Sequence, residues 1–329
     1  MAGDPLEKSV LECNEILNKI KVEVHKVIVG QDKALDDVLK CFVCGGHVLV
    51  EGVPGTAKTL IIVVLAKTLK DAVFQRIQFT PDLLPSDITG TSVYEKKKGF
   101  YVVKGPIFAN LVAGDEINRA PPKVQSAMLQ AMQEKEVTVA KETLPLPSPF
   151  FVLATQNPLE TRDVYPLPEA QLDRFLMKVK IGYTSKIEET KIADNNMEVK
   201  DFADFDVKPV VTLKDILNIR EVVKKIYISH EVKKYIVNIV NATRHPKKYG
   251  LKEARLISCG ASPRASINIA FSARATALMA GRVYVTPDDV RSVAFPVLRH
   301  RLILSYEGKA AETNTDDLID AIIKIVPVM

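Results

Sequence analysis

The chain has 329 residues, of which 47% are hydrophobic and 26% charged, and its formal net charge is +5 at pH 7. This composition is that of an ordinary globular protein of about two domains, and the modest charge permits anionic partners without arguing for them. No run of about 18 apolar residues exists, and no apolar segment follows a basic start, so the sequence predicts no membrane insertion and no signal peptide. Four cysteines in a chain of this size do not resemble a secreted disulfide framework, so we expect a cytoplasmic protein.

Two helices are predicted at the N-terminal end. Apolar residues recur at steps of three and four over residues 5–26, and a second helical stretch runs to about Lys40. Between the helices lies a short apolar segment with Val29 and Gly30, which is placed to clamp a nucleotide base but could equally be an ordinary apolar turn.

Cys41 and Cys44 form a C-x-x-C pair at the predicted junction between the second helix and the first strand. No second pair accompanies them. We therefore interpret them as buried thiols in preference to a zinc or redox site.

A phosphate-binding loop follows. Residues 47–51 predict a buried strand and residues 60–70 a helix, and the segment between them reads Gly52-Val53-Pro54-Gly55-Thr56-Ala57-Lys58-Thr59. Strand, glycine loop, Lys-Thr and helix form the context that the motif G-x-x-x-x-G-K-[ST] requires. One position departs from the motif, because alanine stands where the second glycine is expected.

The residues of this loop fit the chemistry of a triphosphate. Backbone N–H groups at a helix N-terminus would bind the phosphates, and Gly52 and Gly55 let the backbone bend around them. Lys58 would reach the β- and γ-phosphates, and the Thr59 hydroxyl would ligate Mg²⁺. Ala57 allows the same close approach provided that its φ is negative. The alternative is an ordinary glycine-rich turn.

Residues 73–79 alternate and predict a strand, and residues 80–90 predict a loop because prolines and a glycine interrupt them. Residues 91–104 predict a hairpin with the lysines 96–98 at its tip. This tip is either a solvated turn or a contact with a substrate.

A second nucleotide signature lies at residues 109–116. An apolar run, predicted as a buried strand, ends in Asp115-Glu116. In an open parallel sheet, ligands bind beyond the carboxyl ends of the strands, so both acids should lie beside the phosphate loop. Asp115 would hold the magnesium ion through a water molecule, and Glu116 would orient and polarise the attacking water.

The next segment predicts a helix over residues 123–134, a hairpin over 137–147 and a strand over 150–155. Asn157 follows this strand directly. It is placed to hydrogen-bond a γ-phosphate or the attacking water, although an Asn-Pro pair is also typical of a simple bend.

A short helix near Pro168 and a last strand over residues 176–181 complete five strands alternating with helices. This order predicts an α/β fold with a parallel sheet and right-handed crossovers. Arg174 lies at the end of that helix, where it could simply face the helix dipole.

The pattern changes after residue 184. We predict a nucleotide-binding domain over 1–184, a linker over 185–210 and a helical lid without clear strands over 211–329. The predicted lid helices lie near 212–226, 229–244, 263–281, 286–299 and 315–326. Arg264 stands at the start of one of them and could point into a cleft between domains, although a lone arginine there is commonly just exposed.

Taken together, these residues resemble the MoxR family of AAA+ ATPases, in its helix-2 insert clade, over nearly the whole chain. The collinear matching segments are Val29-Gly30-Gln31, Gly46 to Leu49, Gly52 to Thr59, Gly105 to Asn110, Asp115 to Pro122, Ala154 to Pro158, Tyr165 to Phe175, Ser262-Pro263-Arg264 and Leu298-Arg299-His300-Arg301. The family commonly has alanine at the position of Ala57. One departure is Asp163-Val164, where the family often has Gly-Thr.

The resemblance implies a five-stranded AAA+ sheet domain followed by an all-α lid. It also implies roles for three residues: Asn157 as sensor 1, Arg174 as the arginine finger and Arg264 as sensor 2. The expected activity is Mg²⁺-dependent hydrolysis of ATP in a ring, most simply a hexamer, coupled to remodelling of a protein partner.

The resemblance further implies a von Willebrand factor A domain protein as partner. Two other roles share the architecture: a DNA-stimulated motor of the MCM type and the ATPase subunit of a metal chelatase. Nucleic acid is the less favoured partner because no basic stripe interleaved with aromatic residues accompanies the hairpin lysines.

Overall fold

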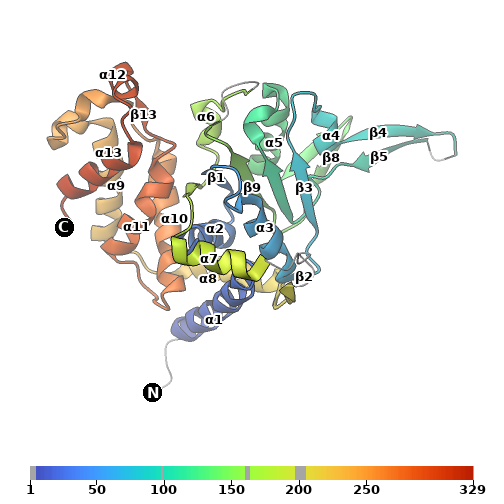
Figure 1. Ribbon diagram of the computed structural model, residues 1–329, viewed down its shortest axis with the longest axis horizontal. Helices are drawn as coiled ribbons and strands as arrows, with labels where there is room; N and C mark the ends of the chain where they lie inside the picture. The colour runs from blue at the N-terminus through green and yellow to red at the C-terminus, as the bar shows by residue number, and fades with distance from the viewer. Residues whose placement is uncertain (1–4, 98, 160–163, 197–204, 329) are drawn as a thin grey trace.

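The computed structural model describes residues 5–97, 99–159, 164–196 and 205–328. A sheet with helices on both faces lies beside a group of helices formed by the C-terminal third of the chain (Figure 1). Lys98 at the hairpin tip and residues 197–204 of the predicted linker lie outside the described residues. None of the helices in the described ranges is long and apolar enough to cross a membrane.

The central sheet confirms the predicted fold class. Its five strands in the described ranges are all parallel and stand in the order β10-β1-β9-β6-β3. They are β1 (Val48–Gly52), β3 (Phe74–Gln78), β6 (Leu111–Asp115), β9 (Phe151–Gln156) and β10 (Met177–Ile181). Because β1 lies between β10 and β9, the phosphate loop leaves the interior of the sheet and not its edge.

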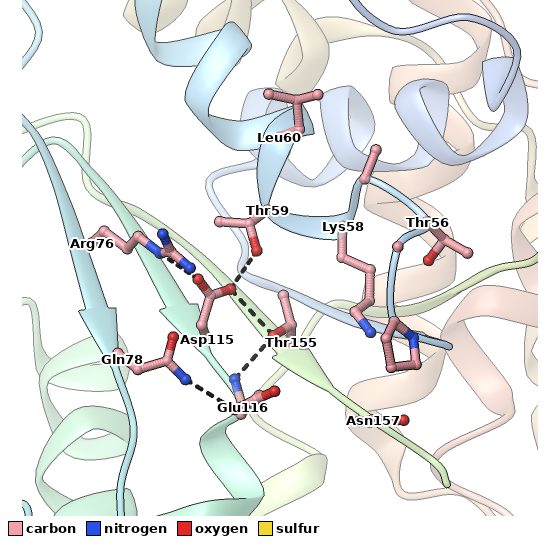
Figure 2. A pocket seen from close by; sticks show the side chains of 13 residues that line it. Thr56, Lys58, Thr59, Leu60, Arg76, Gln78, Asp115, Glu116, Thr155 and Asn157 are labelled. Carbon is pink, nitrogen blue, oxygen red and sulfur yellow. Dashed lines mark hydrogen bonds and ion pairs between the residues drawn. The ribbon is translucent and has the colours of Figure 1, made fainter. Parts of the chain in front are cut away.

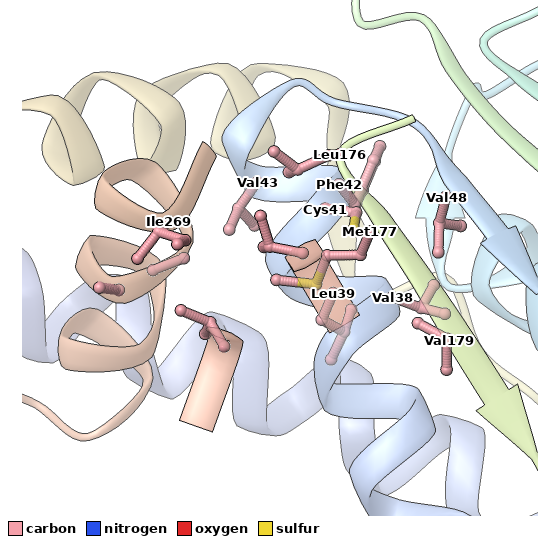
Figure 3. Packing of buried hydrophobic residues seen from close by; sticks show 14 of the residues in the cluster. Val38, Leu39, Cys41, Phe42, Val43, Val48, Leu176, Met177, Val179 and Ile269 are labelled. Atoms are coloured by element: carbon pink, nitrogen blue, oxygen red, sulfur yellow. The ribbon is translucent and has the colours of Figure 1, made fainter. Parts of the chain in front are cut away.

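Alternating side chains of these buried strands enter two separate cores. Val48 and Val50 belong to the core that includes α1 (Pro5–His25), α2 (Asp32–Cys44) and α3 (Lys58–Lys67), whereas Leu49 belongs to the core under α4 (Pro85–Thr89) and α5 (Pro122–Glu134). Figure 3 shows α2 packed between β10 and Ile269 of a C-terminal helix. The sheet is thus fixed from both faces.

Both predicted hairpins are present. Strands β4 (Gly90–Glu95) and β5 (Gly99–Lys104) pair antiparallel, as do β7 (Glu136–Val139) and β8 (Glu142–Pro145). The β4–β5 hairpin extends well away from the body of the molecule (Figure 1). Helix α4 lies in the segment predicted as a loop, because its single turn is too short to show a helical period.

The C-terminal part is mainly helical, as predicted. Its helices are α8 (Leu213–Lys225), α9 (His230–Arg244), α10 (Pro263–Met279), α11 (Pro287–Leu298), α12 (Tyr306–Ala310) and α13 (Thr315–Ile325), and α7 (Lys186–Asn196) precedes them. Helix α12 was not predicted. Among the described α-helices, only α6 (Glu169–Leu172) lies between β9 and β10 in the sequence.

The expectation of no strand beyond residue 185 was wrong. Strand β11 (Val211–Thr212) pairs with β2 (Leu69–Lys70), where the helix was predicted to continue, and β12 (Ile257–Cys259) pairs with β13 (Ile303–Leu304). Pairs of two or three residues are too short to produce a period-two pattern in a sequence.

Candidate nucleotide site

The segment between β1 and α3 turns tightly around the start of the helix. A side chain at Gly52 would place its Cβ 2.5 Å from the carbonyl oxygen of Ile181, and Gly55 has a φ of +81°. A side chain therefore does not fit at Gly52, and the backbone of Gly55 favours glycine. The Thr56 hydroxyl donates a hydrogen bond of 2.8 Å to the carbonyl oxygen of Val53 and closes the loop. The first N–H groups of a helix have no acceptor within the helix itself, so the start of α3 is suited to bind an anion.

Ala57 differs from expectation. Its φ is 61° and its ψ is 25°, so the condition of a negative φ is not met. The chain needs a left-handed residue to enter α3, which explains why the general motif has glycine at this position. A side chain in this conformation costs about 1–2 kcal/mol. The loop therefore carries backbone strain at the residue before Lys58.

Lys58 points back into the loop. Its ammonium group donates to the carbonyl oxygens of Gly52 and Val53, the latter at 3.1 Å. Residues 54–59 line one wall of a cavity of about 310 Å³ (Figure 2). The opposite wall comes from the ends of three strands, and it contributes Arg76, Gln78, Asp115, Glu116, Thr155 and Asn157.

Asp115 accepts hydrogen bonds from three side chains of this cavity. It is 4% exposed, and its Oδ1 accepts hydrogen bonds from the hydroxyls of Thr59 at 2.5 Å and Thr155 at 3.3 Å. Its Oδ2 accepts from Nε of Arg76 at 2.6 Å (Figure 2). Strand pairing explains the last contact, because β3 and β6 run side by side in parallel.

Glu116 is held by a second group of contacts. It adopts the left-handed conformation with a φ of 58°, and its N–H donates to the Thr155 hydroxyl at 2.9 Å. Its Oε2 accepts from Gln78 at 2.9 Å and from Arg119 at 3.2 Å. A strained backbone that neighbouring groups stabilise is typical of residues that act on a ligand.

Asn157 is 6% exposed and lines the cavity at the end of β9. Its Oδ1 also accepts a hydrogen bond of 3.2 Å from the N–H of Leu159. Asn157 therefore both lines the cavity and stabilises the bend after β9. The two roles that the sequence offered as alternatives are compatible.

The two arginines expected as the finger and as sensor 2 lie elsewhere. Arg174 and Arg264 line a second cavity of about 230 Å³ and are not among the residues that line the first. Arg264 lies 3.7 Å from Oδ2 of Asp173. Within the described ranges, no hydrogen bond or ion pair is formed by the guanidinium of Arg174.

The segment of Val29 and Gly30 lies outside the first cavity as well. Gly30 has a φ of +70°, and a Cβ there would lie 2.6 Å from a carboxylate oxygen of Glu188. The neighbouring Gln31 donates a hydrogen bond of 2.8 Å to the carbonyl oxygen of Gly182. The segment thus packs against the chain that follows the last strand.

Cys41 and Cys44 both lie in the last turn of α2 as free thiols, and not at a junction with the strand. Burial raises the pKa of the Cys41 thiol well above its usual value and that of Cys44 to about 12. Among the described residues, no group of three or more His, Cys, Asp or Glu side chains could hold a metal ion. Cys41 is buried and Cys44 is half-buried, so the interpretation as buried thiols fits Cys41 fully and Cys44 in part.

Three residues of the site were missed. Arg76 contacts Asp115, Gln78 contacts Glu116, and Thr155 contacts both. The sequence did contain a signal, since Arg76 and Gln78 stand two residues apart in a predicted strand and so share one face. Reading that signal required knowing that β3 lies beside β6.

Known protein families match both the sheet region and the helical C-terminal part of this chain. Residues 47–177 match the model of the ATPase family associated with various cellular activities, and residues 251–322 match the AAA lid domain. The chain is 44% identical to Chaperone MoxR1 of Mycobacterium tuberculosis over 94% of this chain and 81% of that protein. It is 28% identical to Protein MoxR of Paracoccus denitrificans over 98% and 99% of the two chains.

A solved structure is similar throughout. It is the crystal structure of a protein from Cytophaga hutchinsonii identified as a candidate ATPase. The two share 46% identity, 98% coverage of each chain and a TM-score of 0.90.

Proposed function

This chain belongs to the MoxR family of AAA+ ATPases, and from that premise we propose that it hydrolyses ATP with Mg²⁺ in an oligomeric ring and uses the energy to remodel a protein partner. One observation carries the proposal: the loop residues 54–59, Asp115, Glu116 and Asn157 converge on a single cavity. Each of these residues is of the type that its step in the reaction needs.

The phosphates bind to the loop. The N–H groups at the start of α3 donate to their oxygens, and Lys58 exchanges its carbonyl partners for the β- and γ-phosphates. Thr59 and Asp115 fit a magnesium ion, because a hydroxyl and a buried carboxylate 2.5 Å apart are the oxygen donors that this ion accepts beside phosphates. When bound, the ion supplies neutralisation of charge on the β- and γ-phosphates.

Glu116 orients and polarises the attacking water, and Asn157 hydrogen-bonds that water or the γ-phosphate. Gln78 and Arg119 keep the Glu116 carboxylate at one side of the cavity. A preorganised carboxylate does not have to reorient during the reaction, which favours the hydrolytic step.

The ring proposal rests on the position of the two arginines. Arg174 and Arg264 share a cavity that is separate from the loop of their own chain. We infer that both act on the nucleotide of a neighbouring subunit, Arg174 as the finger and Arg264 as sensor 2. An arginine finger contributes about 10³–10⁵ in rate. A hexamer, the separation into domains at 184 and 210, and a base contact by Val29 and Gly30 remain predictions.

The β4–β5 hairpin supports a protein partner. Tyr94 and Phe100 form an aromatic pair with ring centroids 5.1 Å apart, and their side chains are 62% and 76% exposed. Exposed aromatic residues on a projecting ribbon are typical of protein recognition. Lys96 and Lys97 are also exposed at this end, so a DNA-stimulated motor stays the second candidate.

The hydrolytic assignments are tested by the steady-state turnover of ATP. Lys58→Ala should lose nucleotide binding, Glu116→Gln should bind ATP and hydrolyse it slowly, and Arg174→Ala should bind ATP with little turnover. Lys67→Ala, exposed on the same helix as Lys58, is the control. Wild-type turnover in all three variants would show that these roles are wrong.

The assembly and the partner need two further measurements. Sedimentation with ATP and Mg²⁺ gives the ring stoichiometry, and a monomer under turnover conditions would exclude a finger from a neighbour. A Glu116→Gln trap should capture a von Willebrand factor A domain protein. Salt-sensitive stimulation of turnover by DNA would favour the motor instead, and stimulation only by chelatase subunits with a tetrapyrrole would favour the chelatase.

A further inference from the structure

The segment after α11, Leu298-Arg299-His300-Arg301, contacts the chain around Arg174. Arg299 donates from Nη1 to the carbonyl oxygen of Lys178 at 2.9 Å, and Nε2 of His300 lies 3.3 Å from the carbonyl oxygen of Phe175. A segment of the helical C-terminal part thus holds the backbone that runs from the arginine finger into β10.

Arg301 makes the largest set of these contacts. Its side chain is 1% exposed, and its Nε donates to Oδ1 of Asp173 at 2.7 Å. Its Nη2 donates to the carbonyl oxygens of Asp173 at 3.1 Å and Phe175 at 2.6 Å. Its Nη1 donates to the carbonyl oxygens of Leu176, at 3.3 Å, and of Val297. A planar guanidinium used in this way fixes several backbone groups in one geometry.

Asp173 links the same point to α10. Its carboxylate accepts from the Ser262 hydroxyl at 3.2 Å and lies 3.7 Å from Nη1 of Arg264. Ser262 precedes the first residue of α10, and Arg264 stands in its first turn. One carboxylate therefore connects Arg301 with Arg264 and lies next to Arg174 in the sequence.

Arg174 needs such support. Its guanidinium makes no hydrogen bond or ion pair within the described part of its own chain, so no such bond fixes the side chain and its position depends on packing and on the backbone. That backbone lies between the short helix α6 and β10, and Arg301 holds the residues on both sides of it.

We propose that Arg301 is a positioning residue, which clamps Asp173 and the following carbonyls so that Arg174 and Arg264 are presented together to the nucleotide of the neighbouring subunit. The proposal rests on the trans action of Arg174 proposed above. Its consequence is that the helical C-terminal part and Arg174 move as one unit. This movement does not depend on the nucleotide bound at the phosphate loop of the same chain.

A mixed ring separates this role from a structural one. Donor subunits carry Glu116→Gln, so they keep the finger but hydrolyse slowly. Acceptor subunits carry Arg174→Ala, so they keep a complete loop site but lack the finger. Turnover should recover on mixing, because donor fingers then complete acceptor sites. Arg301→Gln is added either to the donor or to the acceptor.

The expected result is asymmetric. In the donor, Arg301→Gln should reduce the recovered turnover by about tenfold to a hundredfold, since a displacement of about 1 Å can cost that much. In the acceptor it should change turnover by less than about twofold, because the finger of that subunit is already absent. Arg255→Gln in the donor, with a side chain that is 78% exposed, is the control.

Each other outcome overturns the inference. Equal losses of turnover from Arg301→Gln in the donor and in the acceptor would assign Arg301 a purely structural role. No loss of turnover in the donor would show that Arg301 does not position Arg174. If the parent donor and acceptor do not recover on mixing, the trans action of Arg174 fails and this inference falls with it.

The folding of every variant is checked by its melting temperature and by binding of fluorescent ADP, which should equal that of its parent. If Arg301→Gln does not fold, Asp173→Asn carries the same test. It keeps the shape of the side chain, which is partly exposed, and removes the charge that Arg301 and Arg264 share.

Discussion

The guanidinium of Arg76 donates to Oδ2 of Asp115 at 2.6 Å, on the acid that we expect to hold magnesium. The side chain of Asp115 is 5% exposed, whereas that of Arg76 is 59% exposed. A buried carboxylate without a counter-charge is costly, so Arg76 compensates Asp115 from the solvent side. The same positive charge must repel a metal ion that approaches this acid.

Arg76→Gln should therefore bind divalent metal more tightly. A divalent ion and a guanidinium about 6 Å apart repel each other by about 1.4 kcal/mol in water, which corresponds to a factor of about ten. Binding of Mn²⁺ to the protein with ADP, followed by its electron paramagnetic resonance signal, measures this affinity. Arg76→Lys should remain close to wild type, and weaker binding in Arg76→Gln would mean that Arg76 mainly holds the Asp115 rotamer.

Ala57→Gly should stabilise the protein. It removes a left-handed alanine that costs about 1–2 kcal/mol, and greater freedom of the unfolded chain offsets about 0.5–1 kcal/mol of that gain. A net gain of about 0.5–1 kcal/mol should appear in urea denaturation. Ala66→Gly, in the same helix with ordinary geometry, should instead destabilise; equal losses in both variants would contradict the role of strain.

Thr155→Val should lower both stability and turnover. Valine has nearly the same shape but cannot accept the hydrogen bond from the N–H of Glu116, and an unpaired buried donor costs about 1–3 kcal/mol. Loss of this bond also frees the turn that positions Glu116. Urea denaturation and ATP turnover test the two effects, with the exposed Thr138→Val as control. Unchanged turnover would show that Glu116 does not depend on this contact.

Acid should destabilise the protein through His47. Its Nδ1 accepts from the N–H of Val152 at 3.0 Å, its Nε2 lies 3.0 Å from the carbonyl oxygen of Met132, and burial lowers the pKa of His47 to about 4. The unfolded chain, with a histidine pKa of about 6.5, binds more protons between these values, so stability falls as the pH falls below 6.5.

His47 should thus contribute a loss of about 2 kcal/mol in the free energy of unfolding between pH 7 and pH 5. Burial also lowers the pKa of His300, which adds to the loss in the same direction. His47→Gln should show a smaller drop than wild type in urea denaturation at the two pH values. The exposed His245→Gln should keep the wild-type drop, and equal drops in all three proteins would exclude His47 as a cause.

The sequence allowed much of the fold to be predicted, because the information was local. Apolar runs gave the five strands, and polar residues at their ends gave Asp115, Glu116 and Asn157. The pairs Arg76–Asp115 and Arg301–Asp173 could not be found in this way, since they join residues 39 and 128 positions apart. Such contacts depend on which strands and helices lie side by side. The left-handed Ala57 was missed because a sequence motif does not state the sign of a φ angle.

The order of the strands also governs how the phosphate loop is made. Val48 of β1 pairs with Leu153 of β9 and with Met177 of β10, both of which are synthesised long after the loop. Pairing over such sequence distances is slow to form, and the apolar helix α3 lacks its contacts with β9 until then. A nascent chain that ends before residue 151 therefore carries every residue of the loop without the two strands that hold it.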